Sequence, residues 1–161
     1  MRDDEFESLY AAEAAGLFSF LAYRTGDRAL AEDLLADAFE RALRARRRFD
    51  RRRGSQKTWL YAIALNVLRD HARRASAEAR AFERAGVSDT VGSELSQVEH
   101  RDEVQRALTA LSAEEREAIA LRFGADLTVP EIAKVLKEPL TTVEGRVYRA
   151  LRKLRERLDA D

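Results

Sequence analysis

The chain has 161 residues, enough for one ordinary domain or two small helical ones, and its apolar fraction of 45% suffices for a core. No run approaches the roughly 20 apolar residues that a membrane span needs. The absence of cysteine and the wide separation of His71 and His100 argue against zinc sites and nucleophilic catalysis. We therefore expect a cytoplasmic protein that is not an enzyme, binds no metal or cofactor and does not insert into a membrane.

The first half of the chain predicts three helices. A period of 3.6 residues covers 5–23, and a second helix, capped by Asp27 after the Gly26 turn, reaches Ala45. Its apolar stripe contains Leu34, Leu35, Ala38, Phe39, Ala42 and Leu43. A basic loop over 46–57 follows, in which Ser55 is placed to cap a third helix that runs to Ala75.

The overall net charge is zero, but the charge changes sign along these helices. Residues 1–40 contain ten acidic residues against three arginines, whereas residues 41–74 contain twelve basic residues against two acidic ones. This polarity favours one surface for a basic partner and another for phosphates.

The polar face of the third helix is a candidate nucleic-acid site. Opposite its apolar seam the pattern places Thr58, Ala62, Asn66, Arg69 and Arg73, and the arginine cluster 46–53 with Phe49 lies just upstream. Arginines beside aromatic residues suit single-stranded nucleic acid, on which bases stack and guanidinium groups follow phosphates. Trp59 fits either a core position or a base platform. Asn66 is a poor helix former with a hydrogen-bonding edge that matches a base.

The periodicity weakens over 76–98, which predicts a flexible linker that is helical at most over 77–85. It returns at 101, and three later helix starts share the S/T-x-x-E pattern of a capping box. These pairs are Ser112 with Glu115, Thr128 with Glu131, and Thr141 with Glu144. Glu144 is therefore either a structural capping residue or a residue that reads bases.

The segments 128–136 and 141–154, joined by the turn 137–140, have helix–turn–helix proportions. Ile132, Ala133 and Leu136 are expected to face an apolar seam on the second helix made of Val143, Val147, Leu151 and Leu154. The opposite face carries Thr142, Gly145, Tyr148, Arg149 and Arg152. The alternative is an ordinary helical hairpin with a solvated basic face.

From Leu9 to Leu158 the chain resembles the bacterial extracytoplasmic-function (ECF) sigma factors of RNA polymerase. The resemblance is carried by the acidic segment 29–45, by the W-L-x-x-I-A-x-N pattern that starts at Trp59, and by the segments 107–123 and 127–155. It implies an all-α protein of two small helical domains joined by a flexible linker. Residues 1–75 would bind polymerase and the −10 element, 76–98 would be the linker, and 99–161 would bind the −35 element through the helix–turn–helix.

The resemblance also implies roles for individual residues. Docking on the clamp helices of core RNA polymerase would involve Asp33, Leu34, Asp37 and Phe39. Melting and holding the −10 element would involve Arg52, Arg53, Lys57, Trp59, Asn66, Arg69 and Arg73. Contact with −35 DNA would involve Thr142, Glu144, Gly145, Arg146, Tyr148, Arg149 and Arg152, with Arg146 and Arg152 on phosphates.

The expected partners are bacterial core RNA polymerase, promoter DNA and an anti-sigma factor. The family commonly has Lys or Arg where this chain has Glu144, and we hypothesise that Glu144 accepts a hydrogen bond from a cytosine amino group. Two other functions remain open from the sequence. One is a helix–turn–helix repressor or activator that binds duplex DNA without polymerase, and the other is an adaptor that docks on polymerase but recognises no promoter.

Overall fold

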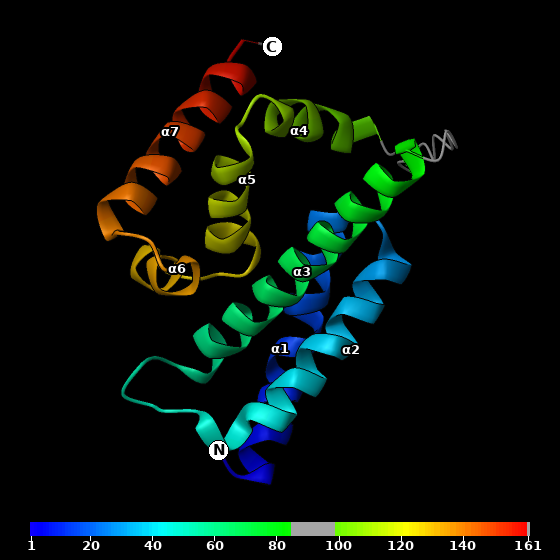
Figure 1. Ribbon diagram of the computed structural model, residues 1–161. Helices are drawn as coiled ribbons and strands as arrows, with labels where there is room; N and C mark the ends of the chain where they lie inside the picture. Colours follow the sequence, from blue (N-terminus) through cyan, green and yellow to red (C-terminus); the bar gives the residue numbers. More distant parts are fainter. Residues whose placement is uncertain (85–98, 161) are drawn as a thin grey trace. The chain divides into compact units, whose positions relative to one another are not determined.

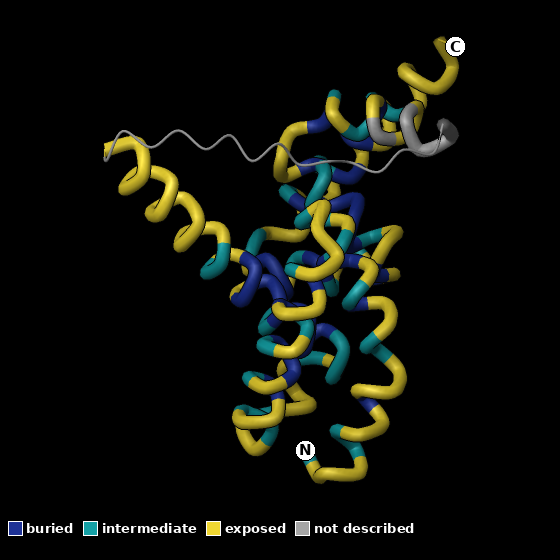
Figure 2. Tube along the Cα trace, turned by 90° about the vertical axis from the view of Figure 1, so that its right-hand side faces the viewer, coloured by how far each residue is buried: buried dark blue, intermediate teal, exposed yellow. Residues whose placement is uncertain are grey.

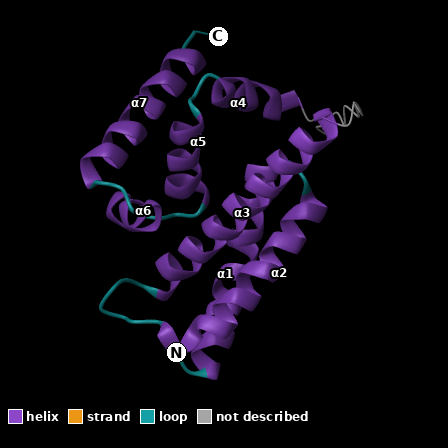
Figure 3. Ribbon diagram, viewed as in Figure 1, coloured by secondary structure: helices purple, strands orange, loops and turns teal. Residues whose placement is uncertain are grey.

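The computed structural model describes residues 1–84 and 99–160 (Figure 1). The chain divides into two compact units, Met1–Glu94 and Leu95–Asp161. All regular elements of the described ranges are helical, which confirms the all-α prediction (Figure 3). Among these helices none is both long and apolar enough to cross a membrane.

The first unit packs three long helices against one another: α1 (Asp3–Thr25), α2 (Arg28–Ala45) and α3 (Gln56–Arg84) (Figure 1). The predicted turn between α1 and α2 is confirmed. Gly26 ends α1 in the left-handed region at φ 68°, which favours glycine, and the Asp27 side chain accepts a hydrogen bond from the Leu30 amide at 3.1 Å. A 3₁₀ turn, η1 (Arg46–Arg48), follows α2.

Aromatic side chains join the three helices in the core of the first unit. Phe20 of α1 meets Tyr61 of α3 edge to face with ring centroids 5.7 Å apart. Phe39 of α2 is buried against Tyr10 and Phe6 of α1, at centroid distances of 4.7 and 6.3 Å. One member of the predicted α2 stripe lies outside this core, since Leu43 is 42% exposed.

Helix α3 continues past its predicted end at Ala75 to Arg84, so residues 77–84, which we predicted as the part of the linker able to be helical, belong to α3. Its residues 72–84 are all exposed, and Figure 2 shows this part in yellow where it leaves the bundle. Alanine, glutamate and arginine dominate the segment, and their high helix propensity explains how it continues without a buried face. Of the predicted linker, 85–98 lies outside the described residues.

The second unit contains α4 (Glu99–Thr109), α5 (Ala113–Ile119), a π-helical turn η2 (Ala120–Gly124), α6 (Val129–Leu136) and α7 (Leu140–Leu158). The predicted helix–turn–helix is confirmed as α6 and α7, and Lys137 ends α6 with φ 55°. Ile132 and Leu136 are buried, as is Val143 on α7. The predicted seam of α7 is wrong at one position, because Leu151 is 43% exposed and Ala150 is buried instead.

The three predicted capping boxes have different outcomes. Thr128 and Glu131 form the complete box, with amide-to-side-chain distances of 2.9 and 3.3 Å. The Ser112 hydroxyl accepts from the Glu115 amide at 3.1 Å, but the Glu115 carboxylate instead accepts from Lys153 Nζ of α7 at 2.8 Å. The third box is wrong, because α7 begins at Leu140 with Pro139 as its N-cap, which leaves Thr141 inside the helix.

Replacing Lys153 with methionine should destabilise the second unit by about 1–3 kcal/mol, because it leaves the buried Glu115 carboxylate without its partner. The Lys153 hydrogen bond lowers the pKa of Glu115 below its ordinary value of 4.5. The pair therefore stabilises the fold above about pH 4.5, and this contribution disappears as the pH falls through the lowered pKa. Hydrogen exchange of α5 and α7 peptides, compared at neutral and acid pH, measures the loss. A variant that also carries Glu115→Gln should recover part of it.

Candidate functional site

An open cleft lies between the loop before α3 and the start of α1. The cleft has a volume of about 520 Å³ and is lined by Asp4, Glu5, Ser8, Phe49, Arg51, Gly54, Ser55 and Gln56. Phe49 is held by Trp59 of α3, whose ring meets it edge to face with centroids 5.4 Å apart. The half-buried Trp59 thus supports the wall of the cleft and also packs as a core residue does.

Acidic and basic side chains face each other at this cleft. Glu5 forms an ion pair with Arg51 of the loop, and its carboxylate also accepts a hydrogen bond from the Arg2 amide at 2.9 Å. The Arg2 amide is the main cause of a lowered pKa at Glu5, so this carboxylate is ionised at neutral pH. An aromatic wall beside carboxylates suits a flat ligand that carries an amino group.

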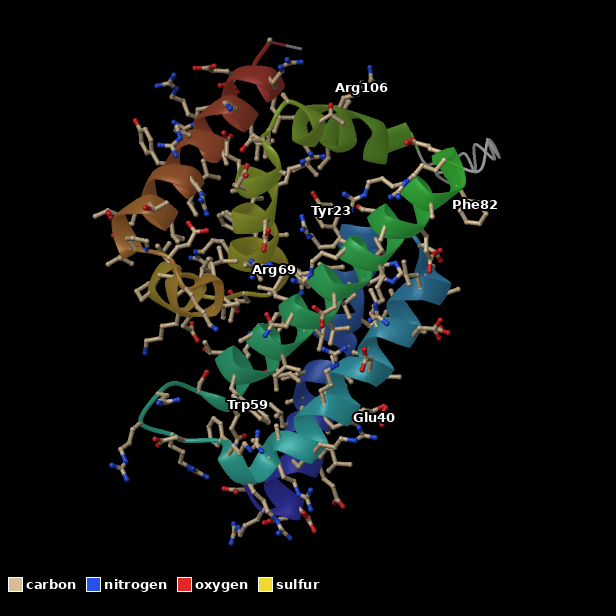
Figure 4. All side chains as sticks on the ribbon, in the orientation of Figure 1. Tyr23, Glu40, Trp59, Arg69, Phe82 and Arg106 are labelled. Atoms are coloured by element: carbon tan, nitrogen blue, oxygen red, sulfur yellow. The ribbon has the colours of Figure 1, made fainter. Side chains whose placement is uncertain are left out.

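Next to the cleft, α3 presents a polar strip. Asn66, Arg69 and Arg73 are exposed on α3, as predicted, and Figure 4 labels Arg69 along the helix from Trp59. Arg52 and Arg53 are exposed on the loop, and Lys57 is half-buried. Two residues that we predicted on this exposed face, Thr58 and Ala62, are less exposed than predicted.

Thr58 is buried at the helix start, where its hydroxyl lies 2.8 Å from the Ser55 hydroxyl, and Ala62 is half-buried.

The outer face of α2 carries acidic residues. Asp33 is exposed, Asp37 is partly exposed, and Glu40 points outward (Figure 4). Leu34 and Phe39, which we predicted for docking, are both more than nine-tenths buried in the core of the first unit, so their side chains support this face from beneath. Their period on the helix marks them as core residues, whereas Leu43, also on α2, is a large apolar side chain that is 42% exposed.

The exposed face of α7 holds most of the residues that we predicted there. Tyr148 is 68% exposed, Arg149 and Arg152 are exposed, and Thr142 is half-buried. Glu144 is exposed and, within the described part of the chain, has no hydrogen-bond or ion-pair partner. Because α7 starts at Leu140, the capping explanation for this carboxylate is removed.

Arg146 is engaged within the second unit. Its side chain is only 17% exposed and pairs with Glu138 of the inter-helix turn at 2.7 Å. The pair fixes the turn against α7, so Arg146 is less available to a phosphate than Arg149 or Arg152.

Gly145 gives room to Arg149. A Cβ atom at Gly145 would lie 3.0 Å from Arg149 Nη1, so the guanidinium group lies along the helix above the glycine. Gly145 thus shapes the surface of α7 through its neighbour four residues later, one helical turn away.

Family models and relatives match both units. The model of sigma-70 region 2 matches residues 9–78, and that of sigma-70 region 4 matches residues 101–154. The ECF RNA polymerase sigma factor SigX of Bacillus subtilis is 30% identical over 98% of this chain and 85% of its own length. The chain belongs to the ECF RNA polymerase sigma factors.

Two further relatives agree with this assignment. The ECF RNA polymerase sigma factor BldN of Streptomyces coelicolor is 31% identical over 98% of this chain, which spans 62% of the BldN length. A solved structure of the sigma factor RpoE with the anti-sigma factor NepR, from Bartonella quintana, matches with a TM-score of 0.77 and 25% identity over 98% of each chain.

The region 2 match of this sigma factor includes α2, the loop and the first part of α3, and the region 4 match includes every predicted residue of α7. The match begins after Asp4, Glu5 and Ser8, which line the cleft. Sequence reasoning missed these residues because they are far from the loop along the chain. The acidic start of α1 opposite an arginine-rich loop was the available signal.

Proposed function

We propose that this ECF sigma factor binds core RNA polymerase in the cytoplasm, recognises −35 and −10 promoter elements and starts transcription without itself catalysing a reaction. The observation that carries the proposal is the combination within the first unit of an acidic α2 face with a cleft-bearing basic loop and α3. A duplex-binding repressor needs the helix–turn–helix but neither of these surfaces.

The cleft is suited to hold a base that has left the duplex. A base can stack on Phe49, and the arginines of the loop can follow the phosphates of the unpaired strand. The carboxylates of Asp4 and Glu5 line the cleft beside Arg2 and Arg51, and they can accept a hydrogen bond from a base with an exocyclic amino group, that is cytosine, adenine or guanine. Capture of an unstacked base offsets part of the cost of unpairing, so that melting requires no bond chemistry.

The two remaining surfaces have simpler roles. Asp33 and Asp37 on α2 complement a basic surface of polymerase, and the exposed Leu43 adds apolar contact. Tyr148, Arg149 and Arg152 on α7 meet the −35 major groove and its phosphates. An anti-sigma factor is a further proposed partner, as the solved complex of RpoE with NepR supports.

The proposed function is tested by promoter melting with purified bacterial core polymerase. Permanganate should modify unpaired thymines near −10 only when both the sigma factor and polymerase are present. Binding to polymerase without melting at any promoter would favour the adaptor, and binding to duplex DNA without polymerase would favour the regulator.

Replacing Glu144 with lysine should tighten binding to duplex DNA and steepen its salt dependence by about 0.9 in log–log slope, because one phosphate contact is added. If Glu144 reads a cytosine amino group, the preference at one −35 base pair should also fall by about 1–3 kcal/mol. Glu114→Lys on α5 makes the same charge change at an exposed position outside α7. Tighter binding with an unchanged −35 preference would leave Glu144 only an electrostatic role.

A further inference from the structure

Four side chains of alternating charge connect α2 to α3: Asp37, Arg41, Asp70 and Arg73. We propose that this charge chain couples polymerase docking on α2 to phosphate binding on α3. The inference rests on the proposed function, because Asp37 is a docking residue there and Arg73 a DNA-binding residue. Neither Arg41 nor Asp70 belongs to the residues that the sequence predicted for either task.

The two inner residues of the charge chain each serve two partners. Arg41 donates from Nε and Nη2 to the two carboxylate oxygens of Asp37 at 3.1 and 3.2 Å, and from Nη1 to Asp70 Oδ2 at 2.9 Å. Asp70 Oδ1 accepts from Arg73 Nη2. The hydrogen bonds from Arg41 and Arg73, the former the larger cause, lower the pKa of Asp70 and keep its carboxylate ionised.

The first three side chains of the charge chain are partly shielded from solvent, whereas Arg73 at its end is exposed. The side chains of Asp37, Arg41 and Asp70 are between 32% and 39% exposed, so solvent screens their interactions only in part. Arg73 is 76% exposed and can reach a phosphate once Asp70 releases it. A bidentate arginine–carboxylate pair is also geometrically specific, so loss of the Asp37 carboxylate removes two hydrogen bonds that hold the Arg41 guanidinium group in place.

Competition for Asp37 at one end of the charge chain therefore changes how strongly Arg73 is held at the other end. When a basic surface of polymerase draws Asp37 away, Arg41 retains only Asp70 and binds it more fully. Asp70 then holds Arg73 less strongly, and Arg73 becomes available to the DNA backbone. By thermodynamic reciprocity, a phosphate that captures Arg73 must favour docking at Asp37 by the same factor.

The test measures binding of the whole 161-residue chain, without polymerase, to fluorescent single-stranded oligodeoxythymidine across a range of salt concentrations. Asp37→Asn imitates the loss of the carboxylate to a partner. We expect about threefold tighter binding, as is typical of partly exposed ion pairs. The slope of log affinity against log salt should steepen by about 0.7, the value for one added phosphate contact on a single strand. Glu32→Gln, also on α2 and exposed, removes one charge outside the charge chain and should leave the slope unchanged.

A double-mutant cycle with Arg73→Ala decides the outcome. The gain from Asp37→Asn should disappear when Arg73 is absent. A gain of equal size with and without Arg73, or one that Glu32→Gln reproduces, would overturn the coupling and leave the proposed function intact. If Arg73→Ala alone leaves single-strand affinity unchanged, both the DNA role of Arg73 and the coupling are wrong.

Discussion

Replacing Asp33 with lysine is expected to weaken binding to bacterial core polymerase by about 1–3 kcal/mol, or roughly 5- to 150-fold. The substitution converts an attraction to a basic surface into a repulsion between like charges. Asp33 is exposed and has no partner within the described residues, so the fold should not change. Binding to labelled polymerase at several salt concentrations measures the effect, which should shrink as salt rises.

The matched control for Asp33 is Glu7→Lys, which makes the same charge change on the exposed surface of α1. If both variants bind polymerase equally weakly, the effect comes from net charge, and α2 is not a specific docking surface for polymerase. If neither loses affinity, docking occurs elsewhere on the molecule.

Replacing Asn66 with alanine is expected to reduce promoter melting roughly 5- to 150-fold, since a hydrogen-bonded side chain that reads a base contributes about 1–3 kcal/mol. Polymerase binding should not change, because Asn66 lies on α3 rather than on the acidic face of α2. The same substitution should make α3 slightly more stable, because alanine is the better helix former. Permanganate reactivity near −10 and thermal unfolding, measured on one preparation, report the two opposite effects.

The control for Asn66 is Ser76→Ala, on the exposed end of the same helix and away from the cleft. It should leave melting unchanged. Equal melting by the Asn66 variant and the native protein would contradict a base-reading role and move the −10 contacts to the loop.

Local sequence patterns predicted the start of a helix correctly where the capping residues have a single structural use. Asp27 as a cap after Gly26 and the Thr128–Glu131 box were both predicted, because each satisfies backbone amides that have no helical partner. The same pattern failed at Thr141. Pro139 accepts from the Thr142 and Val143 amides and starts α7 earlier, and the S/T-x-x-E spacing does not distinguish an N-cap from a residue in the first turn.

Contacts between distant segments could not be predicted from the sequence. The Asp4–Ser8 wall of the cleft and the Lys153–Glu115 pair depend on packing between helices, which no spacing rule encodes. The burial of Leu34 and Phe39 was predicted correctly from the helical period, whereas their role in docking was not a deduction from the pattern. Leu34 and Phe39 lie on the predicted apolar stripe, and the family resemblance alone suggested that they contact polymerase.

The most direct test of the sigma-factor function is run-off transcription with purified core polymerase on fragmented genomic DNA of the source organism, followed by mapping of the start sites. The protein should direct initiation at discrete sites that share a two-part motif centred near −35 and −10. The Asn66→Ala and Asp33→Lys variants should initiate much less often at these sites. Binding to polymerase with starts no more focused than those of polymerase alone would contradict promoter recognition. Failure to bind polymerase at all would contradict the function as a whole.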